Sequence, residues 1–184
     1  MLLGLDVSIV GLRDLGVPIA EVEETGTTFA ENARLKASAY AIQSGLHTLA
    51  DDSGLEVSAL DGRPGVRSAR YGGEQTPFSE KIELLLEELR LREAADRSAR
   101  FVCSLALGDP SGKIVFEAEG ICSGHIAFAP AGSGGFGYDP VFIPDGFDAT
   151  FGELPAAVKA RVGHRGRAVA QIVPFLRRFY AIPT

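Results

Sequence analysis

Two adjacent aspartates stand where a strand of the chain is expected to end. Asp51 and Asp52 follow the apolar run 48–50 and precede Ser53 and Gly54. Ligands of α/β sheets usually bind at such strand ends. Neighbouring residues of a strand point to opposite faces, so one aspartate should face a site, and the pattern does not say which. A turn with solvated acids would account for the same residues.

A second acidic pair, Glu23 and Glu24, precedes Thr25 and Gly26. A carboxylate here could join an aspartate in binding Mg²⁺, which prefers oxygen ligands and keeps several waters. The helix dipole also favours acids just before a helix, so a purely structural role stays open.

Lys36 lies four residues after Asn32, on the same face of a helix whose start the capping box of Thr28 and Glu31 predicts. Its ammonium group could meet a phosphate. A single lysine of this kind is more often a solvated surface charge.

Glycines recur around two aromatic residues in the segment 132–139, at positions 132, 134, 135 and 137. Glycine lets the backbone approach a ligand closely, and the ring of Phe136 offers a flat face on which a base could stack. The phosphate-binding pattern G-x-x-x-x-G-K-[ST] is absent. A tight structural turn is the alternative.

Three basic residues, Lys159, His164 and Arg165, are expected across a helix end and the loop that follows it. Their N–H donors could read a carbonyl group of a base or bind a phosphate. A lysine near a helix C-terminus is also favoured by the dipole alone. No Ser-His-Asp or Cys-His pattern stands out, so the sequence gives no support for a covalent mechanism.

The elements that must position these residues mix helices and strands, which indicates an α/β or α+β class. We expect helices over 28–44, from about 77, over 155–162 and over 167–178. We expect strands over 48–50, 55–60, 100–107, 113–119 and 120–128.

The composition is that of a globular protein of 184 residues with a net charge of −6, which argues against nucleic acid or an anionic membrane as the main partner. Cys103 and Cys122 are expected as reduced core thiols. No apolar run approaches the ~20 residues of a membrane span, and no leader pattern opens the chain. The cytoplasm is the expected compartment.

The motifs together resemble one family. From Glu23 to the C-terminus, and in the same order, the chain is similar to the inosine/xanthosine triphosphate pyrophosphatases. The similarity lies in TGTTFAENA (25–33) with Lys36, ADDSGL (50–55), PGVRSARY (64–71), GGFGYDPVF (134–142), and GHRG (163–166) with Lys159. The family often has serine where Gly163 stands.

The resemblance implies an α/β fold with an elongated mixed β-sheet, flanking helices and two lobes around a central cleft. It implies one domain over 1–184, usually a homodimer. The implied activity converts faulty purine nucleoside triphosphates, namely ITP, dITP and XTP, to the monophosphate and pyrophosphate.

The resemblance also implies residue roles. Asp52 would be the catalytic acid and a Mg²⁺ ligand, with Glu23 the second metal-binding acid. Lys36 would help to balance the charge of the phosphates. The remaining substrate contacts would come from Ser53, Phe136, Gly137, Tyr138, Asp139, Lys159, His164 and Arg165. Donors from His164 and Arg165 would pair with the 6-oxygen of hypoxanthine or xanthine and would face the amino group of adenine.

One departure concerns the start of the chain. The family opens with a strand and a Thr-x-Asn-x-x-Lys loop that binds triphosphate, whereas the stretch from Met1 to Val7 looks like the family's second strand. We therefore expect an N-terminally incomplete domain. Two other functions stay open: a non-catalytic nucleotide-binding protein, and a Maf-like nucleotide pyrophosphatase with another base preference.

Overall fold

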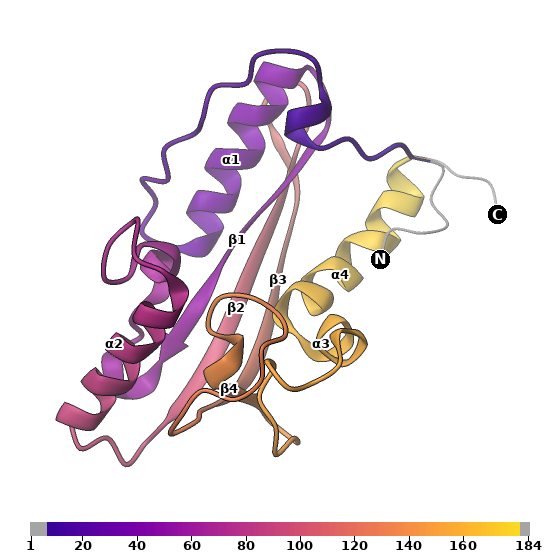
Figure 1. The fold of residues 1–184 in the computed structure, drawn as a ribbon. Coiled ribbons are helices and arrows are strands. Elements are labelled where there is room, and N and C mark those ends of the chain that lie inside the picture. The colour runs from indigo at the N-terminus through magenta and orange to yellow at the C-terminus, as the bar shows by residue number, and fades with distance from the viewer. Residues whose placement is uncertain (1–6, 181–184) are drawn as a thin grey trace. The chain divides into compact units, whose positions relative to one another are not determined.

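The computed structural model describes residues 7–180, so most of the stretch expected to be the family's second strand lies outside the described residues. The elements are α1 (Phe29–Ser44), β1 (Thr48–Val57), α2 (Phe78–Leu91), β2 (Ser98–Gly108), β3 (Ile114–Ile126), β4 (Phe142–Pro144), α3 (Ala156–Val162) and α4 (His164–Phe179). Along the chain, β1 lies between α1 and α2, three strands then follow, and two helices come last (Figure 1).

The four strands form one antiparallel sheet in the order β1-β2-β3-β4. A tight turn at 109–112 joins β2 to β3, and in it the Gly112 N–H donates to the Asp109 carbonyl at 2.8 Å. β3 then pairs with β4, with Gly124 opposite Pro144. The α/β class is confirmed. The described strands are antiparallel rather than mixed, because the short turn folds β3 directly back onto β2.

Two expected strand breaks do not occur. β1 runs without interruption through Asp51 and Asp52, and β3 is a single strand where two were expected. The aspartates therefore lie inside a strand and not at its end. The polar run 51–54 resembles a turn in sequence, but side chains from α1 supply Asp52 with hydrogen-bond partners.

The described residues divide into two compact units. The first contains the described parts of Met1–Asp52, Cys103–Glu119 and Arg167–Thr184, and the second contains Ser53–Val102 and Gly120–Gly166. The predicted central cleft and elongated outline stay predictions.

Small side chains let α1 pack closely on the sheet of the first unit. Ala33 and Ala37 are fully buried against Ala106 of β2. A Cβ on Gly108 would lie 2.7 Å from the Ala37 carbonyl oxygen, so glycine is needed at this crossing. The alternate residues of β2, Cys103, Leu105 and Leu107, pack instead against α4. The period-two alternation of β2 thus gives each helix its own face.

The second unit has one large apolar core. The stripe predicted for α2, which includes Ile82, Leu85 and Leu89, packs there with residues of β1, β2 and β3. Phe101 contacts Phe142 with ring centroids 4.6 Å apart. This core supports the glycine-rich segment, because Tyr138 and Val141 belong to it.

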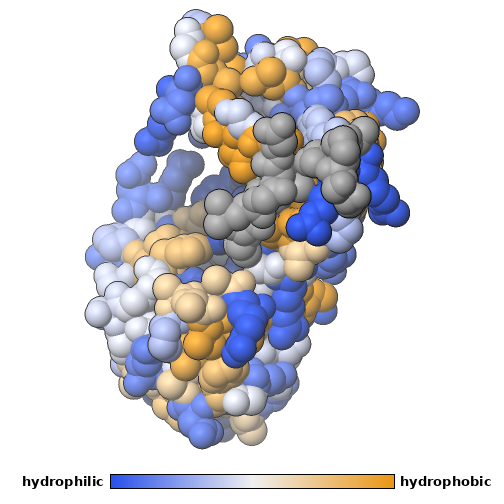
Figure 2. All heavy atoms as spheres, turned by 90° about the vertical axis from the view of Figure 1, so that its right-hand side faces the viewer, coloured by the Kyte–Doolittle hydropathy of each residue, from blue (hydrophilic) through white to orange (hydrophobic). Residues whose placement is uncertain are grey.

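Between residues 7 and 180, no helix has both the length and the apolar character that crossing a bilayer requires. Figure 2 shows apolar and hydrophilic residues interspersed on the face that it draws, as is common for protein surfaces.

The predicted capping box at the start of α1 is confirmed. The Glu31 N–H donates to the Thr28 hydroxyl at 3.2 Å, and the Glu31 carboxylate accepts from the Thr28 N–H at 3.1 Å. The same carboxylate accepts from the hydroxyl and the N–H of Thr27, and these bonds lower the pKa of Glu31. The first turn of α1, which leads into Asn32 and Lys36, is therefore firmly held.

We predict that Thr28→Ala lowers the free energy of unfolding by about 1 kcal/mol, because a helix loses its N-cap. Urea denaturation followed by circular dichroism measures this change. Thr28→Ser keeps the cap hydroxyl and should behave like the wild type. Equal stabilities of the Ala and Ser variants would contradict the capping role.

Candidate functional site

A buried or half-buried group of polar side chains surrounds Asp52 in the first unit. We call Glu24, Asn32, Lys36 and Asp52 the Asp52 cluster. The Lys36 ammonium donates to Glu24 at 2.7 Å and to Asp52 Oδ1 at 3.0 Å. The Asn32 side-chain amide donates to Asp52 Oδ2 at 3.1 Å. Each oxygen of the Asp52 carboxylate thus accepts a hydrogen bond from α1.

Burial and hydrogen bonds shift the pKa values of Asp52 and Lys36. Asp52 is 9% exposed. Burial raises the pKa of Asp52 above its usual range, by more than the hydrogen bonds from Lys36 and Asn32 lower it. Burial also disfavours the charged form of Lys36, but its hydrogen bonds to Glu24 and Asp52 outweigh this, and the pKa of Lys36 is raised. The lysine therefore stays a cation between two carboxylates.

The positions follow from two simple periods. Asn32 and Lys36 are one helical turn apart and present their side chains on one face of α1. Ala50 and Asp52 share the face of β1 that α1 covers, because alternate strand residues point the same way. Asp51 points away from α1, and the Cys103 thiol donates weakly to it at 3.9 Å. This settles which of the two aspartates meets Lys36.

Glu24 shares the Lys36 ammonium with Asp52. The sequence predicts Glu23 as the second metal-binding acid, and that role stays a prediction. Glu24 is half-buried on Lys36, and Glu23 is exposed. Asn32 was noted only for its spacing from Lys36 and was not predicted as a site residue. Its full burial within a polar cluster is the signal that the sequence does not display.

The second unit holds a separate group, the Phe136 cluster, which consists of Phe136, Asp139, Lys159 and Arg165. The Phe136 ring is 62% exposed. The Lys159 ammonium lies 4.1 Å and the Arg165 guanidinium 5.2 Å from its centroid. Two cations beside one exposed aromatic ring form a surface suited to a planar, electron-rich ligand.

The buried carboxylate of Asp139 connects the members of this cluster. It is 1% exposed, its carboxylate accepts the Phe136 N–H at 2.7 Å, and it forms an ion pair with Lys159. Sequence reasoning placed Asp139 in contact with substrate, but its buried carboxylate contacts protein groups. A Cβ on Gly135 would lie 1.9 Å from Asp139 Oδ2, so the loop closes on this carboxylate only with glycine at 135.

The other predicted substrate residues lie in varied surroundings. Tyr138 is buried in the apolar core, and its hydroxyl donates to the Ser68 carbonyl at 3.1 Å. Gly137 has a φ of 66° beside the ring of Phe78. His164 is the first residue of α4 and not a loop residue, because Gly163 alone separates α3 from α4. Its ring stacks on Phe101 at 4.8 Å. Ser53 follows Asp52 on β1 and is half-buried.

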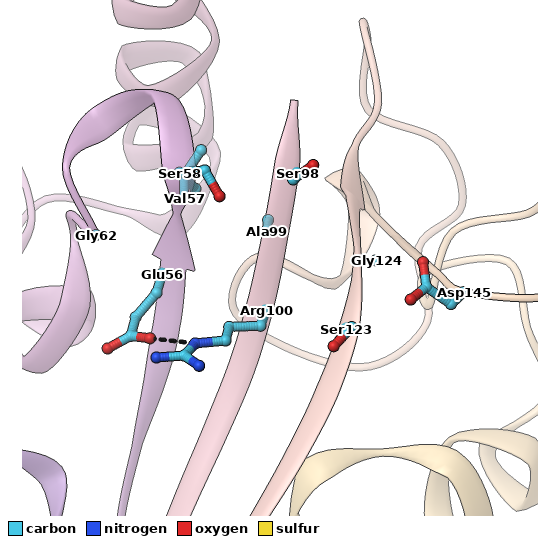
Figure 3. Close-up of a pocket in the computed structure, with 10 residues that line it drawn as sticks. All are labelled: Glu56, Val57, Ser58, Gly62, Ser98, Ala99, Arg100, Ser123, Gly124 and Asp145. Atoms are coloured by element: carbon cyan, nitrogen blue, oxygen red, sulfur yellow. Dashed lines mark hydrogen bonds and ion pairs between the residues drawn. The ribbon is translucent and has the colours of Figure 1, made fainter. Parts of the chain in front are cut away.

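A polar pocket of the second unit lies at a different place on the sheet. This pocket has a volume of about 450 Å³. In it the Arg100 Nε–H of β2 donates to Glu56 Oε2 of β1 at 2.6 Å, near Ser98, Ser123 and Asp145 (Figure 3). None of the predicted site residues lines it. Arg100 pairs with Glu56 and leaves Asp145 as a second carboxylate in the lining, so the pocket offers no unpaired positive charge to a phosphate.

We predict that Lys36→Met destabilises the fold by about 2 kcal/mol near neutral pH, because two carboxylates lose the cation between them. Lys36 lowers the pKa of Asp52, so that its loss raises this pKa further. Protonation then relieves the penalty in acid, and the deficit should grow as pH rises from about 4 to about 7. Chemical denaturation at several pH values measures it.

Lys113→Met, at an exposed lysine of the same unit, is the matched control and should show no such growth. A deficit that is independent of pH would contradict the electrostatic role of Lys36.

Comparison with known proteins gives the chain a family. The Ham1 family profile matches residues 1–175. A dITP/XTP pyrophosphatase of Oceanobacillus iheyensis is 47% identical over 93% of this chain and 86% of its own length, and that of a Nostoc species is 52% identical over 84% and 76%.

Solved structures agree with this result. A HAM1 protein from Coxiella burnetii has a TM-score of 0.90 at 39% identity and covers 96% of this chain and 90% of its own. A nucleoside-triphosphatase / dITP/XTP pyrophosphatase from Mycobacterium abscessus has a TM-score of 0.75 at 44% identity, over 92% and 86%. With the profile spanning nearly the whole sequence, the chain belongs to the Ham1 family.

Proposed function

We propose that this chain hydrolyses the noncanonical purine nucleoside triphosphates dITP, XTP and ITP to the monophosphate and pyrophosphate. The observation that carries the proposal is the 47% identity to a dITP/XTP pyrophosphatase over 93% of the chain. The two clusters support it, because each has the chemistry that one part of such a substrate requires.

The Asp52 cluster suits a divalent cation and phosphate oxygens. Among the described residues, no group of three or more His, Cys, Asp and Glu side chains could hold a metal. Mg²⁺ does not need one, since it commonly takes one or two carboxylates together with substrate phosphates and water. Asp52 and Glu24 fit this donor set, and we assign them as ligands in place of Glu23. When bound, Mg²⁺ neutralises phosphate charge and acidifies water.

Side chains of the cluster supply the remaining groups for hydrolysis. We assign Asp52 as the catalytic acidic residue: its carboxylate acts as a general base, which orients the attacking water and accepts its proton. A carboxylate with a raised pKa is a better base than an ordinary aspartate. Lys36 is already a cation beside Asp52. Its ammonium group can stabilise the negative charge that builds up on the leaving pyrophosphate.

The Phe136 cluster suits a purine base. The exposed ring offers a stacking face, and Lys159 and Arg165 offer donors beside it. Hypoxanthine and xanthine present an acceptor oxygen at position 6, whereas adenine presents an amino donor. A donor that meets another donor leaves both unpaired, which discriminates against adenine. Since His164 is only 4% exposed, Arg165 is the better candidate for this contact.

We further propose that the protein acts as a homodimer in the cytoplasm, with no nucleic-acid or membrane partner. The net charge of −6 supports the absence of a nucleic-acid partner and of an anionic membrane partner. The two alternative functions, a non-catalytic nucleotide-binding protein and a Maf-like pyrophosphatase, predict different experimental results. A non-catalytic protein would bind these nucleotides without turnover, and a Maf-like enzyme would prefer other bases.

The proposal predicts pyrophosphate release from dITP, XTP and ITP at rates at least about tenfold above those from dATP and dGTP. Asp52→Asn keeps the side-chain size but removes the charge, and it should lower kcat by about a hundredfold or more with the fold intact. Asp51→Asn, on the opposite face of β1, is the matched control and should have a smaller effect. Coupled pyrophosphate detection with a triphosphate panel measures both.

Binding without release would support the non-catalytic alternative, and preference for another base would support the Maf-like one. Equal, mild losses in the two aspartate variants would contradict Asp52 as the catalytic acid.

Base choice gives a second prediction for this function. Arg165→Ala should lower kcat/KM for ITP by about tenfold and that for residual ATP hydrolysis by less than about threefold, because only ITP loses an acceptor–donor pair. Arg161→Ala, at an exposed position on α3, is the control. A uniform loss over all bases would place Arg165 on the phosphates instead.

A further inference from the structure

Asn32 is fully buried at the centre of the Asp52 cluster, and both ends of its side chain are hydrogen-bonded. Its Oδ1 accepts the Gly26 N–H at 2.8 Å, and its Nδ2 donates to Asp52 Oδ2 at 3.1 Å. The two bonds fix the orientation of the amide, because a flipped amide would face Gly26 with a donor and Asp52 with an acceptor.

The contact with Gly26 is unusually close. A Cβ at position 26 would lie 2.5 Å from Asn32 Oδ1, so only glycine lets the backbone reach the amide. Gly26 is two residues after Glu24, whose carboxylate accepts from Lys36. A bond that fixes Gly26 therefore also limits where the Glu24 carboxylate can lie.

The bond to Asp52 determines which way its carboxylate turns. Lys36 donates to Oδ1 and Asn32 to Oδ2, so rotation of the carboxylate plane would break both bonds. Each oxygen keeps lone-pair capacity for a further partner. Asn32 adds no charge, so the cluster of Glu24, Lys36 and Asp52 keeps a net charge of −1 when ionised, which favours a cation.

We propose that Asn32 is a positioning residue, which orients Asp52 and connects it to the segment that carries Glu24. The inference rests on the proposed function, since it concerns the groups assigned to hydrolysis. Neighbours that orient a metal-binding carboxylate commonly change activity or metal affinity by about 10- to 100-fold when they are removed.

The test compares Asn32→Ala and Asn32→Asp with Thr28→Ala in the full chain. Asn32→Ala removes both hydrogen bonds. Asn32→Asp keeps the shape and the acceptor for Gly26 but places a carboxylate against Asp52. Thr28→Ala weakens the same helix without touching Asp52, so it shows what loss of stability alone does. Measurements are kcat and KM for dITP, and Mg²⁺ binding by calorimetry without nucleotide.

Both Asn32 variants should lose kcat at least about tenfold relative to Thr28→Ala, with KM changed by less than about threefold. Asn32→Ala should bind Mg²⁺ about tenfold more weakly than Thr28→Ala does. If Asn32 variants match Thr28→Ala in kcat and in Mg²⁺ affinity, the inference is wrong while the proposed function stands.

If the wild-type chain releases no pyrophosphate from any triphosphate, the proposed function is wrong. The Mg²⁺ affinities of the variants then test the positioning role of Asn32 by themselves. A weaker affinity of Asn32→Ala would still support its positioning role. An unchanged affinity, or a wild type that binds no Mg²⁺, would overturn it.

Discussion

The burial of the Asp52 carboxylate against α1 is the constraint on which the first unit depends. An ionised carboxylate with 9% of its surface exposed needs a counter-charge and hydrogen-bond donors. α1 supplies them from one face, through Asn32 and Lys36. This arrangement requires that α1 lie close to the sheet, which explains the alanines at 33 and 37. It also requires a fixed helix start, which the capping box provides.

The second unit uses a buried acid in another way. Asp139 also pairs with a lysine, but it is almost completely covered and it also accepts the Phe136 N–H. Its carboxylate therefore has no surface to offer a ligand. What it presents instead is the Phe136 ring and the Lys159 ammonium beside it. The two acids thus differ in exposure, since 9% of Asp52 and only 1% of Asp139 is exposed, and Asp139 organises the groups around it.

Much of this arrangement could be predicted from the sequence because it is local. The capping box, the apolar stripe of α2 and the turn at 109–112 depend on residues within one or two turns of each other, and all are present. The continuity of β1 through Asp51 and Asp52 could not be predicted, because polar residues interrupt its apolar pattern. The partners of Asp52, Asn32 and Lys36, lie 16 or more residues away in sequence.

The choice between the adjacent acids Glu23 and Glu24 also depends on a contact that is not local in sequence. Glu23 and Glu24 have the same chemistry, and only the path of the backbone decides which one reaches Lys36. That path is fixed by the hydrogen bond from the Gly26 N–H to Asn32 Oδ1. Every residue but proline has a backbone N–H, so the sequence alone gives no sign of this bond. Spacing rules describe side chains on one element, whereas this contact joins a loop to a helix and a helix to a strand. Site residues of this connecting kind are therefore found from burial and hydrogen bonding, once the fold is known.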